Sequence, residues 1–320
     1  MSGDEMTILR TVLALPALAA RRAQVGGQAV IEGVMMRGVE HWSLAVRRPD
    51  QSIGIHDYPL VSWMVRYPVL RAPIVRGVVA LVESLVVGVR ALTTSANESL
   101  GEEEEQLSKK EIAVTVTLAF AFAIALFFLA PLGLTGLLDR WLGEGILFWL
   151  VEGVIRVAIF VAYLVVITIL PDLRRVFEYH GAEHMSIHAL EHGEELTPDA
   201  VGKYRTLHLR CGTSFLLVVL VVSVFVFAAV GRPAWYWLVL SRVVLIPLIA
   251  GISYEIIKWA GRHEGSAFVR VIMWPGLALQ WLTTRRPDRA QIEVAIAALE
   301  KIVELEPQDR PPAKGVEVMA

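Results

Sequence analysis

Cysteine is almost absent from this sequence, since Cys211 is the only one among 320 residues. A single cysteine excludes a framework of internal disulfides and fits either a reducing compartment or a thiolate metal ligand. Charged residues are also scarce, at 19% of the chain, whereas soluble domains contain about 25%. The formal net charge is only -2, so we expect no general affinity for nucleic acid.

Apolar residues are in excess instead, at 55% of the chain, with a mean hydropathy of +0.55. About 20 apolar residues span the hydrocarbon core of a bilayer. Four runs are long enough for this, at residues 112–138, 146–170, 213–230 and 235–260. They predict a mainly α, polytopic helical membrane protein with about four transmembrane helices, whose partner is the lipid bilayer. The sequence identifies no protein partner.

Basic residues in the loops predict how the chain is oriented. The loops at 139–145 and 231–234 contain one arginine each, whereas the loop at 171–212 contains several basic residues. Because basic loops face the cytoplasm, we expect a multi-pass protein of the cytoplasmic (inner) membrane with both termini cytoplasmic. The spans then form a first transmembrane pair at 111–170 and a second pair at 213–260.

The first part of the chain is expected to lie outside the hydrocarbon core. Residues 1–25 form a leader that is disordered or lies on the surface. Residues 26–73 predict a small β-rich cytoplasmic element containing a hairpin with its turn at 49–52. Residues 74–110 predict an interfacial helix and an acidic linker. Three charged residues of that helix form one stripe, namely Arg76, Glu83 and Arg90. A spanning helix would bury these charges at a high cost in free energy, whereas an interfacial helix leaves them exposed to water.

The last part of the chain is also expected outside the hydrocarbon core. Residues 261–305 predict an interfacial segment, broken at Pro275 and Gly276, followed by a cytosolic helix with one apolar face. Residues 306–320 predict a disordered tail.

Three ionisable residues lie inside the predicted spans, namely Glu152, Arg156 and Arg242. Glu152 and Arg156 are four residues apart and are therefore neighbours on one helix face. Arg242 joins them if the spans pack together. The group is either a structural ion pair that fixes helix packing or part of a path for protons or substrate.

Histidine is concentrated between the two predicted pairs of spans. His180, His184, His188 and His192 follow one another at a spacing of four, and His208 lies three residues before Cys211. The stretch predicts a cytoplasmic histidine-rich helix and loop at 171–212, with the helix ending before Gly193. Each step of four residues rotates by about 40°, so the four histidines do not converge on one ion. His188 and His192 are therefore left out of the predicted site.

Within this helix the order His-x-x-Glu-His is the inverted zincin motif. In that motif two histidines bind zinc, and the glutamate accepts a proton from water activated by the metal. His180 and His184 are then ligands of a divalent metal, of which zinc is expected, and Glu183 is the catalytic base. A third ligand comes from elsewhere, and the candidates are Glu191, His208 and Cys211. The alternative is a polar helix whose histidines bond to nearby carboxylates.

Four further residues are weaker candidates for substrate contact. Gln28, Glu32 and Arg37 belong to a glycine-rich extended segment, where Gln28 and Glu32 are expected on one strand face. Glu255, near the end of the fourth predicted span, is a more distant candidate. The alternative for the glycine-rich segment is a packing loop without a role in binding.

Six motifs occur in order and carry a resemblance: GGQAVIEGVMMRG (26–38), YHGAEH (179–184), RCGTSF (210–215), AGISYE (250–255), PGLALQ (275–280) and QIEVAIAAL (291–299). Together they resemble the bacterial YqhQ family, defined by domain of unknown function 1385, over residues 24–305. That family is labelled a predicted metal-dependent enzyme of the membrane. The chain departs from the family's usual residues at Met185, Leu209 and Arg286, none of which is a proposed ligand.

The leading functional hypothesis is a zinc-type hydrolase with its site at the cytoplasmic face of the inner membrane. The alternative is a non-enzymatic membrane scaffold or assembly factor with a structural His/Cys site. A closed site with Cys211 as a fourth ligand would favour the scaffold, because a catalytic zinc site keeps one position open. A transporter that uses Glu152, Arg156 and Arg242 is a third, weaker hypothesis.

Overall fold

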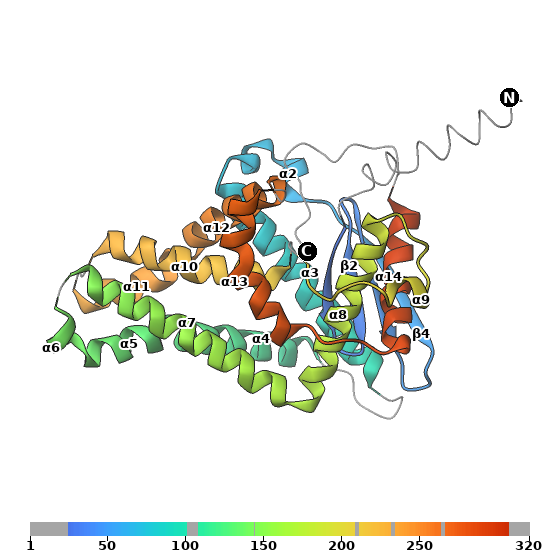
Figure 1. The fold of residues 1–320 in the computed structure, drawn as a ribbon, viewed down its shortest axis with the longest axis horizontal. Coiled ribbons are helices and arrows are strands. Elements are labelled where there is room, and N and C mark those ends of the chain that lie inside the picture. Colours follow the sequence, from blue (N-terminus) through green and yellow to red (C-terminus); the bar gives the residue numbers. More distant parts are fainter. Residues whose placement is uncertain are drawn as a thin grey trace, which may run out of the picture.

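The structure is a computed structural model, and it describes residues 25–100, 108–143, 145–208, 211–231, 234–263 and 266–306. The expected leader up to residue 24 and the expected tail from residue 307 lie outside the described residues. Figure 1 shows two parts, a group of long helices on the left and a sheet covered by helices on the right.

The sheet contains four antiparallel strands in the order β1-β2-β3-β4, which confirms a small β-rich element near the start of the chain. The strands are β1 (Gly26–Val30), β2 (Gly33–Arg37), β3 (His41–Arg47) and β4 (Ile53–Pro59). The hairpin expected around residues 49–52 joins β3 to β4. Glu32, expected on a strand, instead lies in the tight turn between β1 and β2 with a positive φ of 50°.

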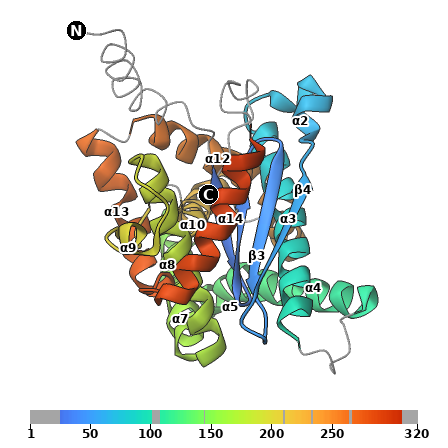
Figure 2. The ribbon, with the colours of Figure 1, turned by 90° about the vertical axis from the view of Figure 1, so that its right-hand side faces the viewer.

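Both faces of the sheet are covered, so β2 is buried along its whole length. Because side chains alternate along a strand, Val34 and Met36 pack into one apolar cluster with helices α8 (Pro171–Glu191) and α14 (Arg289–Leu305). Met35 points the other way, toward helix α3 (Val75–Ser99). Figure 2 shows the sheet with α14 and α3 beside it. The last helix was expected at 291–304 with one apolar face, and α14 confirms this.

The charged residues of the stripe on helix α3 contact other protein groups, whereas the sequence predicts that they face water. Glu83 is buried and accepts hydrogen bonds from the backbone N–H of Trp63 at 2.7 Å and from Arg37 at 3.2 Å. Arg76 pairs with Glu255, and Arg90 lies 4.2 Å from the ring centre of Tyr58. The prediction of a wetted stripe is wrong for Glu83, because its charge is compensated by protein groups.

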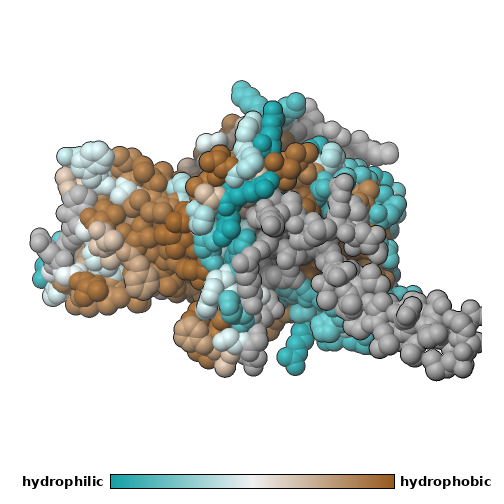
Figure 3. Space-filling view, turned by 90° about the horizontal axis from the view of Figure 1, so that it is seen from above, coloured by the Kyte–Doolittle hydropathy of each residue, from teal (hydrophilic) through white to brown (hydrophobic). Residues whose placement is uncertain are grey.

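Among the described residues, three helices are long and apolar enough to cross a membrane, or up to four if one bent pair is a single span. The three are Lys109–Leu137, α7 (Ile146–Ile169) and α10 (Gly212–Val230). The first contains α4 (Lys109–Ile124), a π-helical turn η2 (Ala125–Leu129) and α5 (Ala130–Leu137). In Figure 3 a hydrophobic surface covers the end of the molecule that these long helices form, whereas the end that contains the sheet is more hydrophilic.

The bent pair consists of α11 (Trp235–Val244) and α12 (Ile246–Arg262), which meet at an angle of 44°. Pro247 follows the break directly, and proline has no N–H to donate to the preceding turn. The run expected at 235–260 is therefore present as two helical pieces.

Helix α13 (Ala267–Thr283) corrects the expectation of a break at residues 275–276. The helix continues through Pro275, and it packs along α10. At their crossing a Cβ on Gly276 would lie 2.9 Å from Oγ of Ser214, so glycine allows the close approach. The remaining helices are short: α2 (Trp63–Arg66), η1 (Pro68–Arg71), α6 (Asp139–Leu142) and α9 (Pro198–Val201).

Candidate metal centre

Helix α8 carries the histidine stretch, and its bounds agree with the sequence prediction. It starts at Pro171, a residue suited to a first helical turn, and ends at Glu191 before Gly193, whose φ is +70°. Its second half is buried between the sheet, α14 and the segment that follows α13. A polar helix is therefore held inside the protein, and its histidines have fixed neighbours.

Gly181 explains how the segment after α13 reaches this helix. A Cβ at position 181 would overlap the carbonyl oxygen of Arg285. The backbone N–H of Arg285 donates to the carbonyl of Phe177 at 2.9 Å, so the segment docks directly on α8. This contact brings the carbonyl of Thr283 to 2.8 Å from Nδ1 of His180. The sequence marks Gly181 only as a weak point of the helix.

Two histidines of α8 have their ring orientation set by backbone carbonyls. Nδ1 of His184 lies 2.5 Å from the carbonyl oxygen of Thr206, and Nδ1 of His180 lies 2.8 Å from the carbonyl oxygen of Thr283. A carbonyl oxygen only accepts, so Nδ1 of each ring donates and Nε2 keeps its lone pair. This is the outer-shell arrangement typical of metal-binding histidines. Burial lowers the pKa of His184 well below its usual value, and neutral imidazole is the form that binds metals.

Cys211 completes this group. Its Sγ lies 3.4 Å from Nε2 of His180, and one ligand atom from each of His180, His184 and Cys211 lies within 4.8 Å of the others. Zinc bonds of about 2.3 Å to sulfur and about 2.05 Å to nitrogen would place tetrahedral ligands about 3.6 Å apart. The three side chains therefore fit a small divalent ion.

The position of Cys211 also suits a thiolate. It is the N-cap of α10, and its sulfur accepts the backbone N–H of Thr213 at 3.4 Å. Burial raises the pKa of the Cys211 thiol, while the hydrogen bonds from Thr213 act in the opposite direction. A helix N-terminus and a bound metal both favour the thiolate.

Glu183 lies beside this group and is buried, with a side-chain oxygen, Oε1, that has no hydrogen-bond partner among the described residues. Burial raises the pKa of Glu183 to about 8, and the proximity of His180 lowers it in part. A Cβ on Gly27 would lie 2.5 Å from Cγ of Glu183, so strand β1 packs directly on the carboxylate. In its ionised form, a buried carboxylate with one unpartnered oxygen near the two histidines is suited to accept a proton.

A cavity of about 500 Å³ adjoins the group. His180, Glu183 and His184 form part of its wall, together with residues of β1, β2, α3 and the start of α10. Most of the lining is apolar, and its polar side chains include Gln28, Arg37, Ser84 and Thr213. Two of the candidate ligands, His180 and His184, and the candidate base Glu183 therefore line one partly open cavity.

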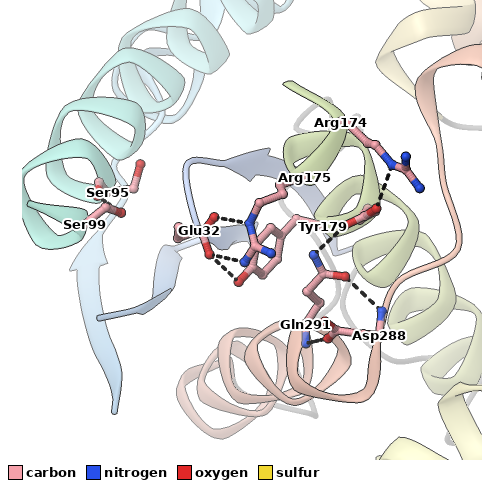
Figure 4. Close-up of polar contacts among 9 residues, drawn as sticks. Glu32, Ser95, Ser99, Arg174, Arg175, Tyr179, Asp288 and Gln291 are labelled. Carbon is pink, nitrogen blue, oxygen red and sulfur yellow. Dashed lines mark hydrogen bonds and ion pairs between the residues drawn. The ribbon is translucent and has the colours of Figure 1, made fainter. Parts of the chain in front are cut away.

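The sequence candidates for substrate contact divide in two. Gln28 and Arg37 line the cavity, whereas Glu32 and Glu255 do not contribute to its wall. Glu32 accepts hydrogen bonds from Nε and Nη2 of Arg175 at 2.5 and 2.6 Å, and Tyr179 lies close by (Figure 4). Glu255 pairs with Arg76. These two glutamates therefore tie elements of the fold together.

His208, a candidate ligand in the sequence, lies in a second group. Its ligand atom is close to those of His188 and Glu191, again within 4.8 Å of one another. His192, the last histidine of the series, is exposed and bonds through Nδ1 to the carbonyl of His188 in its own helix at 2.7 Å. The structure thus brings together His180, His184 and Cys211. His208 comes from the segment after α8 and lies beside the next turn of that helix, near His188 and Glu191.

The ionisable residues of the apolar helices form a separate buried cluster. Glu152 accepts a hydrogen bond from Arg156 at 2.5 Å and from Arg242 at 3.0 Å, and each of the three side chains is at most 2% exposed. Arg156 also donates to Ser223 at 2.7 Å. None of the three lines the cavity described above. The contacts join α7, α10 and α11.

Several residues of the site escape the sequence reasoning. Gly27 and Gly181 matter because other atoms approach them closely, and Thr206 and Thr283 contribute only their carbonyl oxygens. Nothing in the sequence signals these roles. For His188 and Glu191 a signal exists, because the spacing of three places them on one helix face.

Comparisons with known proteins agree with the resemblance seen in the motifs. Residues 72–305 match the family model described as "Protein of unknown function (DUF1385)". A relative from Bacillus subtilis (strain 168), named "Uncharacterized protein YqhQ", is 32% identical over 294 residues, which cover 88% of this chain and 92% of the relative. No solved structure matches the chain significantly.

Proposed function

This chain belongs to the DUF1385 family, and we propose that it is a metal-dependent hydrolase, of the zinc type, of the bacterial inner membrane. The observation that carries the proposal is the convergence of His180, His184 and Cys211 near Glu183, where His180, His184 and Glu183 line a partly open cavity. Such clusters of ligand and carboxylate side chains in a cavity are typical of metal-dependent active sites.

Each residue of the proposed site would have a separate role in hydrolysis. His180, His184 and Cys211 would hold the ion, and the carbonyls of Thr283 and Thr206 orient the two imidazoles toward it. A bound zinc ion would supply an activated water molecule and polarise a substrate carbonyl or phosphoryl group. Glu183 then accepts the proton of the attacking water and passes it to the leaving group.

The number of protein ligands favours an enzyme over a scaffold. Three side chains form the group, and His208 lies in the other cluster, with His188 and Glu191. A site with three protein ligands keeps a fourth position open for water or substrate, whereas structural zinc sites have four. The cavity beside the group would supply that access.

The lining indicates the kind of substrate. Since most of the wall is apolar, the substrate would have an apolar body that displaces little ordered water. Gln28 and Thr213 offer hydrogen bonds to a polar group within it. The body would lie between the sheet, α3 and α10, with its hydrolysable group toward Glu183.

The apolar helices support the membrane part of the proposal. Three or four of them have the length and composition of spans, and basic residues concentrate in the loops on the side of α8. The metal centre would then lie at the cytoplasmic face, at the start of α10. The buried cluster around Glu152 would fix the packing of the spans, because its charges are paired within the protein.

The proposal is tested with the purified full chain in detergent, loaded with Zn²⁺. A panel of chromogenic substrates with apolar chains, comprising esters, amides and phosphodiesters, is measured before and after chelation. We expect hydrolysis of at least one class, its loss on chelation, and a fall of about 100-fold or more in Glu183→Gln with unchanged zinc content. Zinc-loaded protein that hydrolyses none of the panel, or Glu183→Gln with full activity, would contradict the hydrolase assignment.

A further inference from the structure

A second group of ligand side chains lies one helical turn beyond the first. His188 and Glu191 are three residues apart on α8 and therefore share a face of the helix. His208 approaches them from the segment before α10, with its Nε2 at 3.2 Å from Oε2 of Glu191. Nδ1 of His188 lies 3.9 Å from the same oxygen. The rings of His188 and His208 have their centres 4.6 Å apart.

The carbonyl of Leu207 sets the orientation of the His188 ring. Its Nε2 lies 2.8 Å from the carbonyl oxygen of Leu207, which only accepts, so Nε2 donates. In the neutral ring Nδ1 then carries a lone pair, and it faces an oxygen of Glu191. A cation between Nδ1 of His188 and this oxygen would be within reach of both atoms.

The backbone of His208 is also held in place before any ion binds. The side chain of Gln280, which is buried on α13, accepts the N–H of His208 at 2.8 Å and donates to its carbonyl at 2.7 Å. The His208 side chain is 5% exposed, while Glu191 is 34% exposed, so solvent reaches the group from one side. A site whose ligand His208 is already held in position, and which is open to solvent on one side, suits reversible binding of an ion.

We propose that His188, Glu191 and His208 form a second binding site for a first-row divalent metal ion, distinct from the group that contains Cys211. Bonds of about 2.05 Å in a tetrahedral site would place the ligand atoms about 3.3 Å apart, and the separations of 3.2 and 3.9 Å come close to this. Its two nitrogens and one oxygen differ from the nitrogen and sulfur donors of the first site. The second site therefore suits harder ions such as Mn²⁺ or Fe²⁺ as well as Zn²⁺.

The test counts ions bound to the purified full chain. After equilibrium dialysis against Zn²⁺, the wild type is expected to hold two equivalents, and Glu191→Gln and His188→Ala one each. Cys211→Ser is also expected to hold one, and the combination of Cys211→Ser with Glu191→Gln none. His192→Ala is the matched control, because His192 lies one turn away and bonds within its own helix; it should keep two. Circular dichroism confirms that each variant is folded.

Cobalt separates the two sites by their donors. In Cys211→Ser the remaining equivalent of Co²⁺ should bind without a thiolate charge-transfer band, and Glu191→Gln in that background should abolish its binding. Glu191 is partly exposed and glutamine is isosteric with glutamate, so this variant tests the site with little risk to folding. A wild type that binds a single equivalent, lost with Cys211→Ser, would overturn the proposal, as would Glu191→Gln and His188→Ala variants that keep two.

Discussion

Glu183 on α8 packs directly against the backbone of Gly27 on β1, so closely that a Cβ at position 27 would lie 2.5 Å from Cγ of Glu183. Glycine at position 27 therefore allows β1 and α8 to approach this closely. The strand closes one side of the cavity while leaving room for a buried carboxylate whose Oε1 has no partner among the described residues. The proposed base is held in position by this strand.

Replacing Gly27 by alanine should displace the Glu183 carboxylate. The added methyl group meets Cγ and the carboxyl atoms of Glu183, which is buried, so the side chain moves away from His180 and His184. We expect a loss of hydrolysis of about 10²-fold, with the zinc content unchanged. The control is Gly133→Ala on α5, where a Cβ meets no atom within 4 Å. Equal activity of Gly27→Ala and Gly133→Ala would argue against this positioning.

Gly181→Ala should weaken metal binding instead. The new methyl group would overlap the carbonyl of Arg285 and push the docked segment off α8, so His180 loses the carbonyl of Thr283 that orients it. Loss of such an outer-shell partner lowers metal affinity by about 10- to 100-fold. A competition titration with a zinc chelator measures this. Gly261→Ala, also helical but facing open space, should bind zinc as the wild type does.

Much of the fold follows from the sequence because the signals are local. The alternation and turn residues of 26–58 predict the sheet, and Pro171 and Gly193 mark the ends of α8. Apolar length alone predicts the long helices. Pro275 is an exception, because the surrounding apolar contacts with α10 keep α13 helical through a residue that usually interrupts a helix.

The site is predictable only in part, because its contacts join distant segments. The motif at residues 180–184 identifies two ligands and a base from one helix. Whether Cys211 or His208 joins them depends on how α10 and α13 approach α8, and no spacing encodes that. Helical rotation correctly separates the four histidines, yet it gives no sign that His188 meets His208, which is brought there by Gln280.

Glu152→Gln should destabilise the protein while leaving the metal sites intact. The change removes the carboxylate charge that pairs with both Arg156 and Arg242, and both arginines are buried. Breaking a buried pair in this way costs about 3–5 kcal/mol. Denaturant unfolding in detergent measures the change. Glu293→Gln is the control, because its pair with Arg47 is partly exposed and should contribute less than about 1 kcal/mol.

The orientation of the chain is tested by cysteine labelling in intact cells. Glu195 and Arg140 are both exposed and lie on loops expected on opposite sides of the membrane, while the native Cys211 is buried. We expect Arg140→Cys to react with an impermeant maleimide from outside, and Glu195→Cys to react only after permeabilisation. The reverse pattern would invert the topology, and labelling of both from outside would show that the helices between them do not cross.

The most direct test of the metal centre is the absorption spectrum of the cobalt-loaded protein. A charge-transfer band from thiolate to cobalt arises only if Cys211, the single cysteine, binds the ion. The band should be present in the wild type and in Glu183→Gln, and absent in Cys211→Ser, His180→Ala and His184→Ala. Cobalt that binds to the wild type without this band would contradict a centre built from His180, His184 and Cys211.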